Sequence, residues 1–217
     1  MSGTSLIVVP FVQGSKVAQF ELKDASHSIN LFVNGTNKPT ADIYNELNVK
    51  VEIVSKNRPT QVLYDLPLKE IHKALKPYFK GITSPSVSLI PLALNQNLVL
   101  STDVKALITV TWNAQSINSI SYSTNLFLTE TYMPIVVKKV ALANGFTDVE
   151  TDYFTGLLLP NSIKSLETVK DGKRLYQDGI VLASTVFQNE DLFLKVDPYS
   201  ILSVETGADS VGYLVQA

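Results

Sequence analysis

Apolar and polar residues alternate with a period of two through most of this chain. In Leu47–Ile53 the apolar side chains take every odd position, and in Val104–Trp112 they take every even one. Successive side chains of an extended strand point to opposite faces, so each segment predicts a strand with one buried face and one face toward water.

Further segments are rich in the β-branched and aromatic residues that favour strands. They are Leu6–Val12, Val17–Leu22, Ile29–Val33, Val62–Tyr64, Val87–Leu94, Ile117–Leu128, Ile135–Leu142, Val149–Phe154, Ile180–Phe187, Leu192–Val196, Ile201–Val204 and Val211–Val215. In addition, Asp171-Gly172 favours the tight turn of a hairpin between Ile163–Val169 and Lys173–Gln177. Turn signals recur about every 8–12 residues, which favours a mainly β fold, a β-sandwich or jelly roll, over a fold with helices between the strands.

One segment, Asp65–Lys76, has the periodicity of a helix. Its apolar residues would line one helix face: Leu68, Ile71 and Leu75. Asp65 is placed to cap the first turn, Pro67 falls where a missing N–H costs little, and Pro77 would end the helix. The sequence therefore predicts one short principal helix, at residues 65–76.

The length of 217 residues is enough for one large sandwich or for two domains. Charge changes sign near Glu130–Pro134: residues 1–130 hold 11 basic and 9 acidic side chains, whereas residues 131–217 hold 7 and 11. We interpret residues 1–130 as a jelly-roll-like β-sandwich. Residues 131–217 are then a smaller β-domain or a continuation of the same sandwich, since no low-complexity linker separates the two parts.

Charged residues make up 18% of the chain, below the roughly 25% of an average globular protein. Neither part carries the basic field that a phosphate backbone requires, so direct nucleic acid binding is not expected. Sparse charge together with 45% apolar residues indicates that another subunit covers part of the exterior. An ordinary sandwich with an exterior rich in Thr and Ser fits nearly as well. No apolar run reaches the length of a membrane span, and Met1–Val12 makes a poor signal peptide, so the sequence predicts a soluble protein.

The residues that enzymes and metal sites need are scarce. There is no cysteine, which excludes cysteine nucleophiles, disulfides and thiolate metal sites. The two histidines, His27 and His72, are 45 residues apart, and we interpret His72 as a solvent-facing residue of the helix. Nucleophile-elbow, P-loop, dinucleotide-binding and H-E-x-x-H motifs are all missing from the sequence. We therefore predict no enzyme, no catalytic residue, no cofactor and no metal ligand.

One acidic row is nevertheless a candidate for binding a cation. Asp148, Glu150 and Asp152 alternate with three residues that would face inward: Val149, Thr151 and Tyr153. In a strand the three carboxylates would share one face, and their oxygens suit calcium. The alternative, which we favour, is the wet face of an edge strand whose charges discourage pairing.

Trp112 is the single tryptophan, and it ends an alternating strand in register with Ile108 and Val110. This register predicts a core position. A platform for stacking a sugar is the alternative, because polar residues follow: Asn113, Gln115 and Asn118.

Two other surface features have ordinary interpretations. Asn34-Gly35-Thr36 matches a glycosylation sequon, and its composition equally suits a turn. A mild basic cluster around the helix is interpreted as a solvated face: Lys56, Arg58, Lys69, Lys73, Lys76 and Lys80.

The order of the elements resembles a known class of virion proteins. The strand at Leu47–Ile53, the helix at Asp65–Lys76 and the strands at Val87–Leu94 and Val104–Trp112 follow one another within residues 1–130. This order is similar to the jelly-roll capsid proteins of icosahedral, membrane-containing bacteriophages, in which a short helix interrupts the strands of an upright sandwich. The cysteine-free composition, rich in Ser, Thr and Asn, is also similar to that of virion proteins.

The resemblance implies a self-assembling structural protein of a bacteriophage particle, either its capsid or another component such as a spike, neck or tail. Its partners would be further copies of itself and other virion proteins, and it would be made in the host cytoplasm and reside in the virion. The alternative is a carbohydrate- or surface-binding β-sandwich module that uses Trp112 or the acidic row. A structural subunit associates without a ligand, whereas a lectin is stabilised by its ligand.

Overall fold

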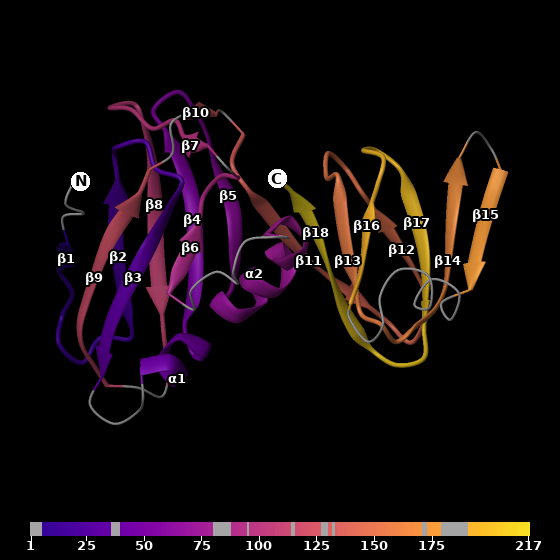
Figure 1. The fold of residues 1–217 in the computed structure, drawn as a ribbon, viewed down its shortest axis with the longest axis horizontal. Coiled ribbons are helices and arrows are strands. Elements are labelled where there is room, and N and C mark those ends of the chain that lie inside the picture. The colour runs from indigo at the N-terminus through magenta and orange to yellow at the C-terminus, as the bar shows by residue number, and fades with distance from the viewer. Residues whose placement is uncertain are drawn as a thin grey trace. The chain divides into compact units, whose positions relative to one another are not determined.

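Figure 1 shows the computed structural model, which describes residues 6–35, 40–79, 88–94, 96–113, 116–126, 130–131, 133–170, 173–178 and 191–217. The chain divides into two compact units. Unit 1 comprises residues 1–136 with Ala217, and unit 2 comprises residues 137–216. The two domains expected at residues 1–130 and 131–217 stay a prediction.

Unit 1 contains two antiparallel four-stranded sheets, with strand orders β1-β9-β3-β6 and β2-β8-β4-β5. The first sheet consists of β1 (Ile7–Val9), β9 (Ile117–Asn125), β3 (Ser28–Gly35) and β6 (Leu89–Pro91). The second consists of β2 (Val17–Leu22), β8 (Val104–Thr111), β4 (Asn48–Ser55) and β5 (Arg58–Pro67). Two short strands, β7 (Asn97–Leu98) and β10 (Glu130–Thr131), pair in parallel.

The core of unit 1 follows from the alternation in the sequence. The ladder between β4 and β8 places Val49 opposite Val110 and Val51 opposite Ile108. All four side chains are fully buried. The neighbouring residues on β8 are only half-buried, so the period of two separates the core face from the outer face as predicted.

Two contacts join the sheets of unit 1 across this core. Phe20 of β2 stacks on Tyr122 of β9, with ring centroids 4.5 Å apart. The hydroxyl of Tyr64 on β5 donates a hydrogen bond of 2.6 Å to the carbonyl of Pro91 on β6. Burial raises the pKa of Tyr64, which keeps this hydroxyl protonated and able to donate. The two sheets therefore form a sandwich, as the sequence predicted.

The predicted helix is present with different bounds: α2 spans Leu68–Leu75, and a 3-10 turn spans Lys76–Phe79. Its predicted apolar face is buried. Asp65 as helix cap was wrong, because β5 continues to Pro67 and the cap position makes no side-chain hydrogen bond. Asp65 instead lies opposite Lys50 in the β4–β5 ladder and accepts a hydrogen bond of 2.7 Å from Asn48 Nδ2.

A second helix, α1 (Thr40–Asn45), was not predicted. It buries Ile43 and Tyr44. The Tyr44 hydroxyl donates to the carbonyl of Leu31 at 2.7 Å and accepts from the amide of Val33 at 3.2 Å, which fixes α1 to β3. None of the helices in the described parts of the chain is long and apolar enough to cross a membrane.

Unit 2 also contains two antiparallel four-stranded sheets, with strand orders β11-β18-β13-β16 and β12-β17-β14-β15. The first consists of β11 (Val136–Leu142), β18 (Ser210–Gln216), β13 (Gly156–Leu159) and β16 (Leu192–Lys195). The second consists of β12 (Gly145–Glu150), β17 (Ile201–Thr206), β14 (Ile163–Lys170) and β15 (Lys173–Asp178). The predicted hairpin is confirmed, with Lys170 opposite Lys173.

Two strands of unit 2 differ from the prediction. The strand expected at Val149–Phe154 is β12, which ends at Glu150 because the chain turns at Asp152, a residue with a positive φ of 45°. Strand β13 was missed, since its four residues are all buried and show no alternation. The strand predicted at Ile180–Phe187 and the turn at Asp171-Gly172 lie outside the described residues.

Candidate assembly surfaces

Exposed apolar side chains gather where two edge strands of unit 1 meet. β1 is an edge strand of the first sheet and β2 an edge strand of the second, and the two strands contact each other. Five large apolar residues of this region are exposed: Leu6, Ile7, Val8, Val12 and Val17. We call these five residues the apolar edge. An edge strand with exposed apolar side chains is a place where another chain can pair or pack.

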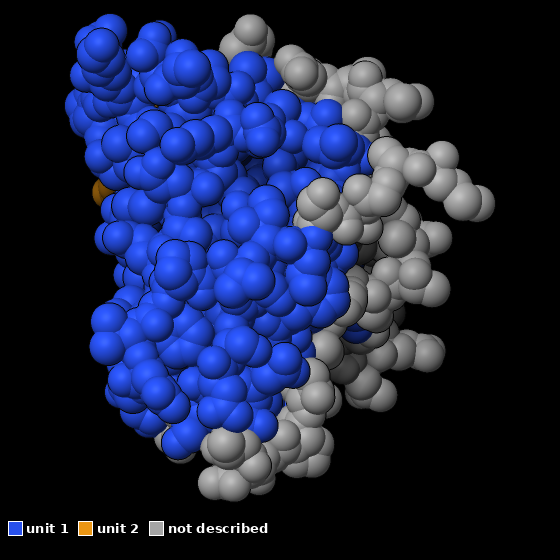
Figure 2. Space-filling view, turned by 90° about the vertical axis from the view of Figure 1, so that its left-hand side faces the viewer, with its two compact units in different colours: residues 1–136, 217 blue, residues 137–216 orange. Residues whose placement is uncertain are grey.

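The apolar edge continues onto the outer face of the first sheet. Val8 lies opposite Ser121 of β9, and Ser121 lies opposite Phe32 of β3. Residues opposite each other in a ladder share a face. Val8 is 70% exposed and Phe32 is 43% exposed, so both present apolar surface to solvent. β1 and β9 lie on the left in Figure 1, and Figure 2 shows unit 1 from that side.

A face of mixed acidic and apolar character lies on the second sheet of unit 2. Phe146, Asp148 and Glu150 alternate along the edge strand β12 and are all exposed, and Ile201 of β17 lies opposite Glu150 and is exposed too. We call these four residues the acidic–apolar face. Within the described part of the chain, neither Asp148 nor Glu150 has an ion-pair partner.

The third carboxylate of the predicted acidic row lies elsewhere. Asp152 follows the end of β12 and forms an ion pair with Lys138, with Nζ and Oδ2 3.3 Å apart. Tyr153, predicted to face inward, is exposed, whereas Val149 and Thr151 are buried as predicted. Among the described residues no three His, Cys, Asp or Glu side chains cluster as a metal site requires. The row is thus two carboxylates on an edge strand and one in a turn.

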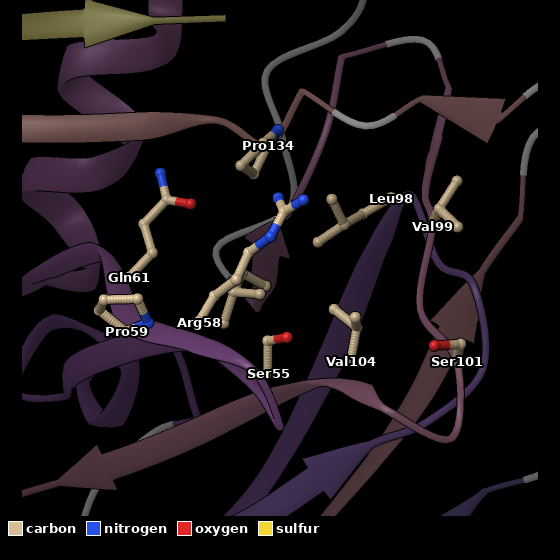
Figure 3. A pocket seen from close by; sticks show the side chains of 10 residues that line it. Ser55, Arg58, Pro59, Gln61, Leu98, Val99, Ser101, Val104 and Pro134 are labelled. Carbon is tan, nitrogen blue, oxygen red and sulfur yellow. The ribbon is translucent and has the colours of Figure 1, made fainter.

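A pocket of about 450 Å³ lies in unit 1 beside the β4–β5 hairpin. Arg58 is the one charged residue among those that line it, and the walls are largely apolar: Ile53, Leu98, Val99, Val104 and Pro134. Figure 3 shows the guanidinium of Arg58 extending toward Pro134, with Ser55 and Ser101 also lining the pocket. The side chain of Arg58 has no ion-pair or hydrogen-bond partner in the described part of the chain. We call this cavity the Arg58 pocket.

Trp112 occupies the core position that the sequence predicted. Its side chain is 2% exposed and meets Phe11 edge to face, with ring centroids 5.8 Å apart and planes at 85°. A sugar-stacking platform requires an exposed ring. Trp112 therefore offers no exposed ring for stacking a sugar.

The two histidines belong to the packing of unit 1. The prediction of a solvent-facing His72 was wrong, because Nε2 of this half-buried ring is 2.6 Å from the carbonyl of Leu89. Nδ1 of His27 is 3.3 Å from the carbonyl of Gln96. Burial lowers the pKa of both imidazoles below the ordinary 6.5, and the hydrogen bonds to backbone carbonyls oppose this shift without reversing it.

We expect unit 1 to lose stability as the pH falls below about 6.5. Above that value the histidines are neutral in both states and contribute nothing. Below it the unfolded chain binds protons that the folded chain excludes, so the free energy of unfolding decreases. We expect the melting temperature, measured by circular dichroism, to drop by several degrees between pH 7.5 and pH 5. His72→Gln keeps a side-chain donor for the carbonyl of Leu89 and should show a smaller drop in melting temperature. An unchanged drop would show that His72 is not a source of the pH dependence.

The remaining predicted surface features are dispersed. Asn34 and Gly35 are the last residues of β3 rather than turn residues, and Asn34 Nδ2 donates to Ser119 Oγ at 3.2 Å; Thr36 lies outside the described residues. The basic residues belong to separate elements: Lys56 and Arg58 to the β4–β5 hairpin, Lys69 and Lys73 to α2, and Lys76 to the 3-10 turn. Lys80 lies outside the described residues.

Comparison with known proteins finds likeness in structure alone. No family model and no curated protein sequence matches the chain. The structure is similar to the major capsid protein of bacteriophage PM2, with a TM-score of 0.59 and 10% identity over 97% of this chain and 95% of the phage protein. It is also similar to the major capsid protein of Sulfolobus turreted icosahedral virus, with a TM-score of 0.55 and 9% identity over 97% and 93%.

These matches establish the fold class. Among the described residues, each unit contains two four-stranded sheets, which is the strand content of one jelly roll. The chain therefore has the double jelly-roll fold of viral major capsid proteins. The resemblance drawn from the sequence is confirmed at the level of the fold, and it extends from residues 1–130 over both units.

Proposed function

We propose that this chain is a structural subunit of a virus particle, a capsid protein that assembles with copies of itself and with other virion proteins. The observation that carries the proposal is the likeness to two viral major capsid proteins over nearly their whole length. The role is structural rather than catalytic, and the site of action is the virion. The scarcity of charged residues supports the same conclusion, as do the exposed apolar edge and the exposed apolar residues of the acidic–apolar face.

The apolar edge and Phe32 are the surface that we assign to contacts between copies. Val8 and Phe32 lie in one row across the first sheet, so a single partner surface can cover both. Burial of a large apolar side chain contributes roughly 1.5–3 kcal/mol. Several such side chains in one interface supply much of the affinity of a subunit contact, provided that the surfaces fit closely.

The purified chain should associate at micromolar concentration without sugar or calcium, which light scattering and electron microscopy would measure. Val8→Lys combined with Phe32→Lys should shift the chain toward monomer, because two charges would be buried in the interface. Ala208→Lys, at an exposed bend of unit 2, is the matched control and should assemble normally. A chain that stays monomeric and is stabilised by a carbohydrate would instead support a surface-binding module.

A further inference from the structure

We propose that the Arg58 pocket binds the acidic–apolar face of a second copy of this chain, with a carboxylate of Asp148 or Glu150 paired to the guanidinium. Phe146 or Ile201 of the same face would pack against the apolar wall of the pocket. This inference rests on the proposed function, because it requires that copies associate.

The Arg58 pocket and the acidic–apolar face carry complementary charge. Arg58 brings a cation into a largely apolar pocket with no carboxylate among the lining residues. Asp148 and Glu150 are exposed carboxylates without an ion-pair partner in the described part of unit 2. Guanidinium and carboxylate groups form paired, charge-assisted hydrogen bonds, and these strengthen where water is excluded. Each surface thus carries the charge that the other lacks.

The Arg58 pocket and the acidic–apolar face are also complementary in size and polarity. The pocket volume of about 450 Å³ is within the range of cavities that bind ligands. Outward side chains of a strand are about 6.6–6.8 Å apart, so Phe146, Asp148 and Glu150 project as a row of roughly 13 Å. An apolar and an acidic side chain from this row can therefore enter one pocket together. Ser55 and Ser101 add hydroxyl groups to the pocket lining, and a hydroxyl can donate a hydrogen bond to a carboxylate.

The two surfaces differ, so the contact between copies is heterologous. The Arg58 pocket belongs to unit 1 and the acidic–apolar face to unit 2. When one copy offers its pocket and the other its face, each pair retains one unused surface of each kind. Such contacts continue from copy to copy, closing into rings or extending into larger arrays. A variant that has lost one surface can still use the other, which gives a direct test.

The test uses three full-length variants, with association measured by sedimentation velocity and folding checked by circular dichroism. Arg58→Glu removes the pocket's cation, and the pair Asp148→Lys with Glu150→Lys reverses the face. These two variants should fold normally and associate at least about tenfold more weakly than the unmodified chain. Lys69→Glu on α2 changes the net charge as Arg58→Glu does, yet it lies outside the pocket and should associate normally.

Mixing the two disabled variants provides the decisive measurement. The Arg58→Glu chain retains a native face and the reversed-face chain retains a native pocket, so a mixture of the two should associate more strongly than either variant alone. A mixture that associates no more strongly than its two components, or an Arg58→Glu chain that associates like the unmodified one, would overturn the inference while leaving the proposed function intact. An unmodified chain that never associates would overturn both.

Discussion

Deletion of residues 210–217 should leave unit 2 unfolded. These residues form β18, which lies between β11 and β13 in the first sheet of unit 2 rather than at its edge. Both neighbouring strands would lose their ladder hydrogen bonds along one side. The deletion also removes Tyr213, Leu214 and Val215, whose side chains are all buried. At roughly 1.5–3 kcal/mol for each side chain, the loss approaches the whole stability of a small domain.

The sequence predicts an apolar strand at Val211–Val215, which should be paired either within the sandwich or against a neighbouring copy. The structure places it inside the sandwich, with Leu158 opposite Tyr213 and Leu157 opposite Leu214. The sequence predicts burial of Val211, Tyr213 and Val215. Tyr213 and Val215 are buried, but Val211 is half-buried, and Gly212 and Leu214 are buried as well. β18 is paired along both edges and its residues 212–215 are buried on both faces, so its loss cannot be confined to one surface.

Hydrogen exchange measured by mass spectrometry would check this prediction. Amides of β13 and β17 should lose their protection in the truncated chain. Removal of Ala217 alone is the matched control, because this residue is exposed and lies beyond the strand. Leu214→Ala should fall between the two, with a loss of about 2–5 kcal/mol in the free energy of unfolding. A truncated chain that retains native protection would show that β18 is dispensable.

Alternation in the sequence predicted those strands that have one wet face. β4 and β8 are recognisable because half-buried residues separate their core residues, and the bounds predicted for β2 agree with the structure. β13 has no polar position to mark its period, so its sequence resembles any short apolar segment. α1 has six residues, too few to establish a helical period, and it is held by the tertiary hydrogen bonds of Tyr44.

The candidate surfaces were predictable only where they follow one strand. Asp148 and Glu150 share a face because they are two residues apart in β12, and this part of the acidic row was correct. Asp152 left the row through a turn with positive φ, a conformation that the sequence did not signal. Arg58 appeared in the sequence as one member of a basic cluster. Its pocket forms because Leu98 and Pro134, which are distant in sequence, lie beside the β4–β5 hairpin. No local sequence pattern predicts that arrangement.

Replacement of Trp112 by alanine should lower the free energy of unfolding by about 3–5 kcal/mol, the usual loss for a fully buried aromatic ring. The ring fills space beside Phe11, and its Nε1 has no hydrogen-bond partner among the described residues. Trp112→Phe keeps an aromatic ring and removes that unpaired N–H, so it should cost much less than Trp112→Ala.

Urea unfolding followed by circular dichroism would measure the Trp112 variants, because replacing the single tryptophan removes the fluorescent probe. In the unmodified chain the emission of Trp112 should lie at short wavelength, as for a ring shielded from water, and sugars should leave it unchanged. If Trp112→Ala retained full stability while the emission of the unmodified chain responded to a sugar, the ring would be a ligand platform. The core assignment, and with it the case against a carbohydrate-binding module, would then be wrong.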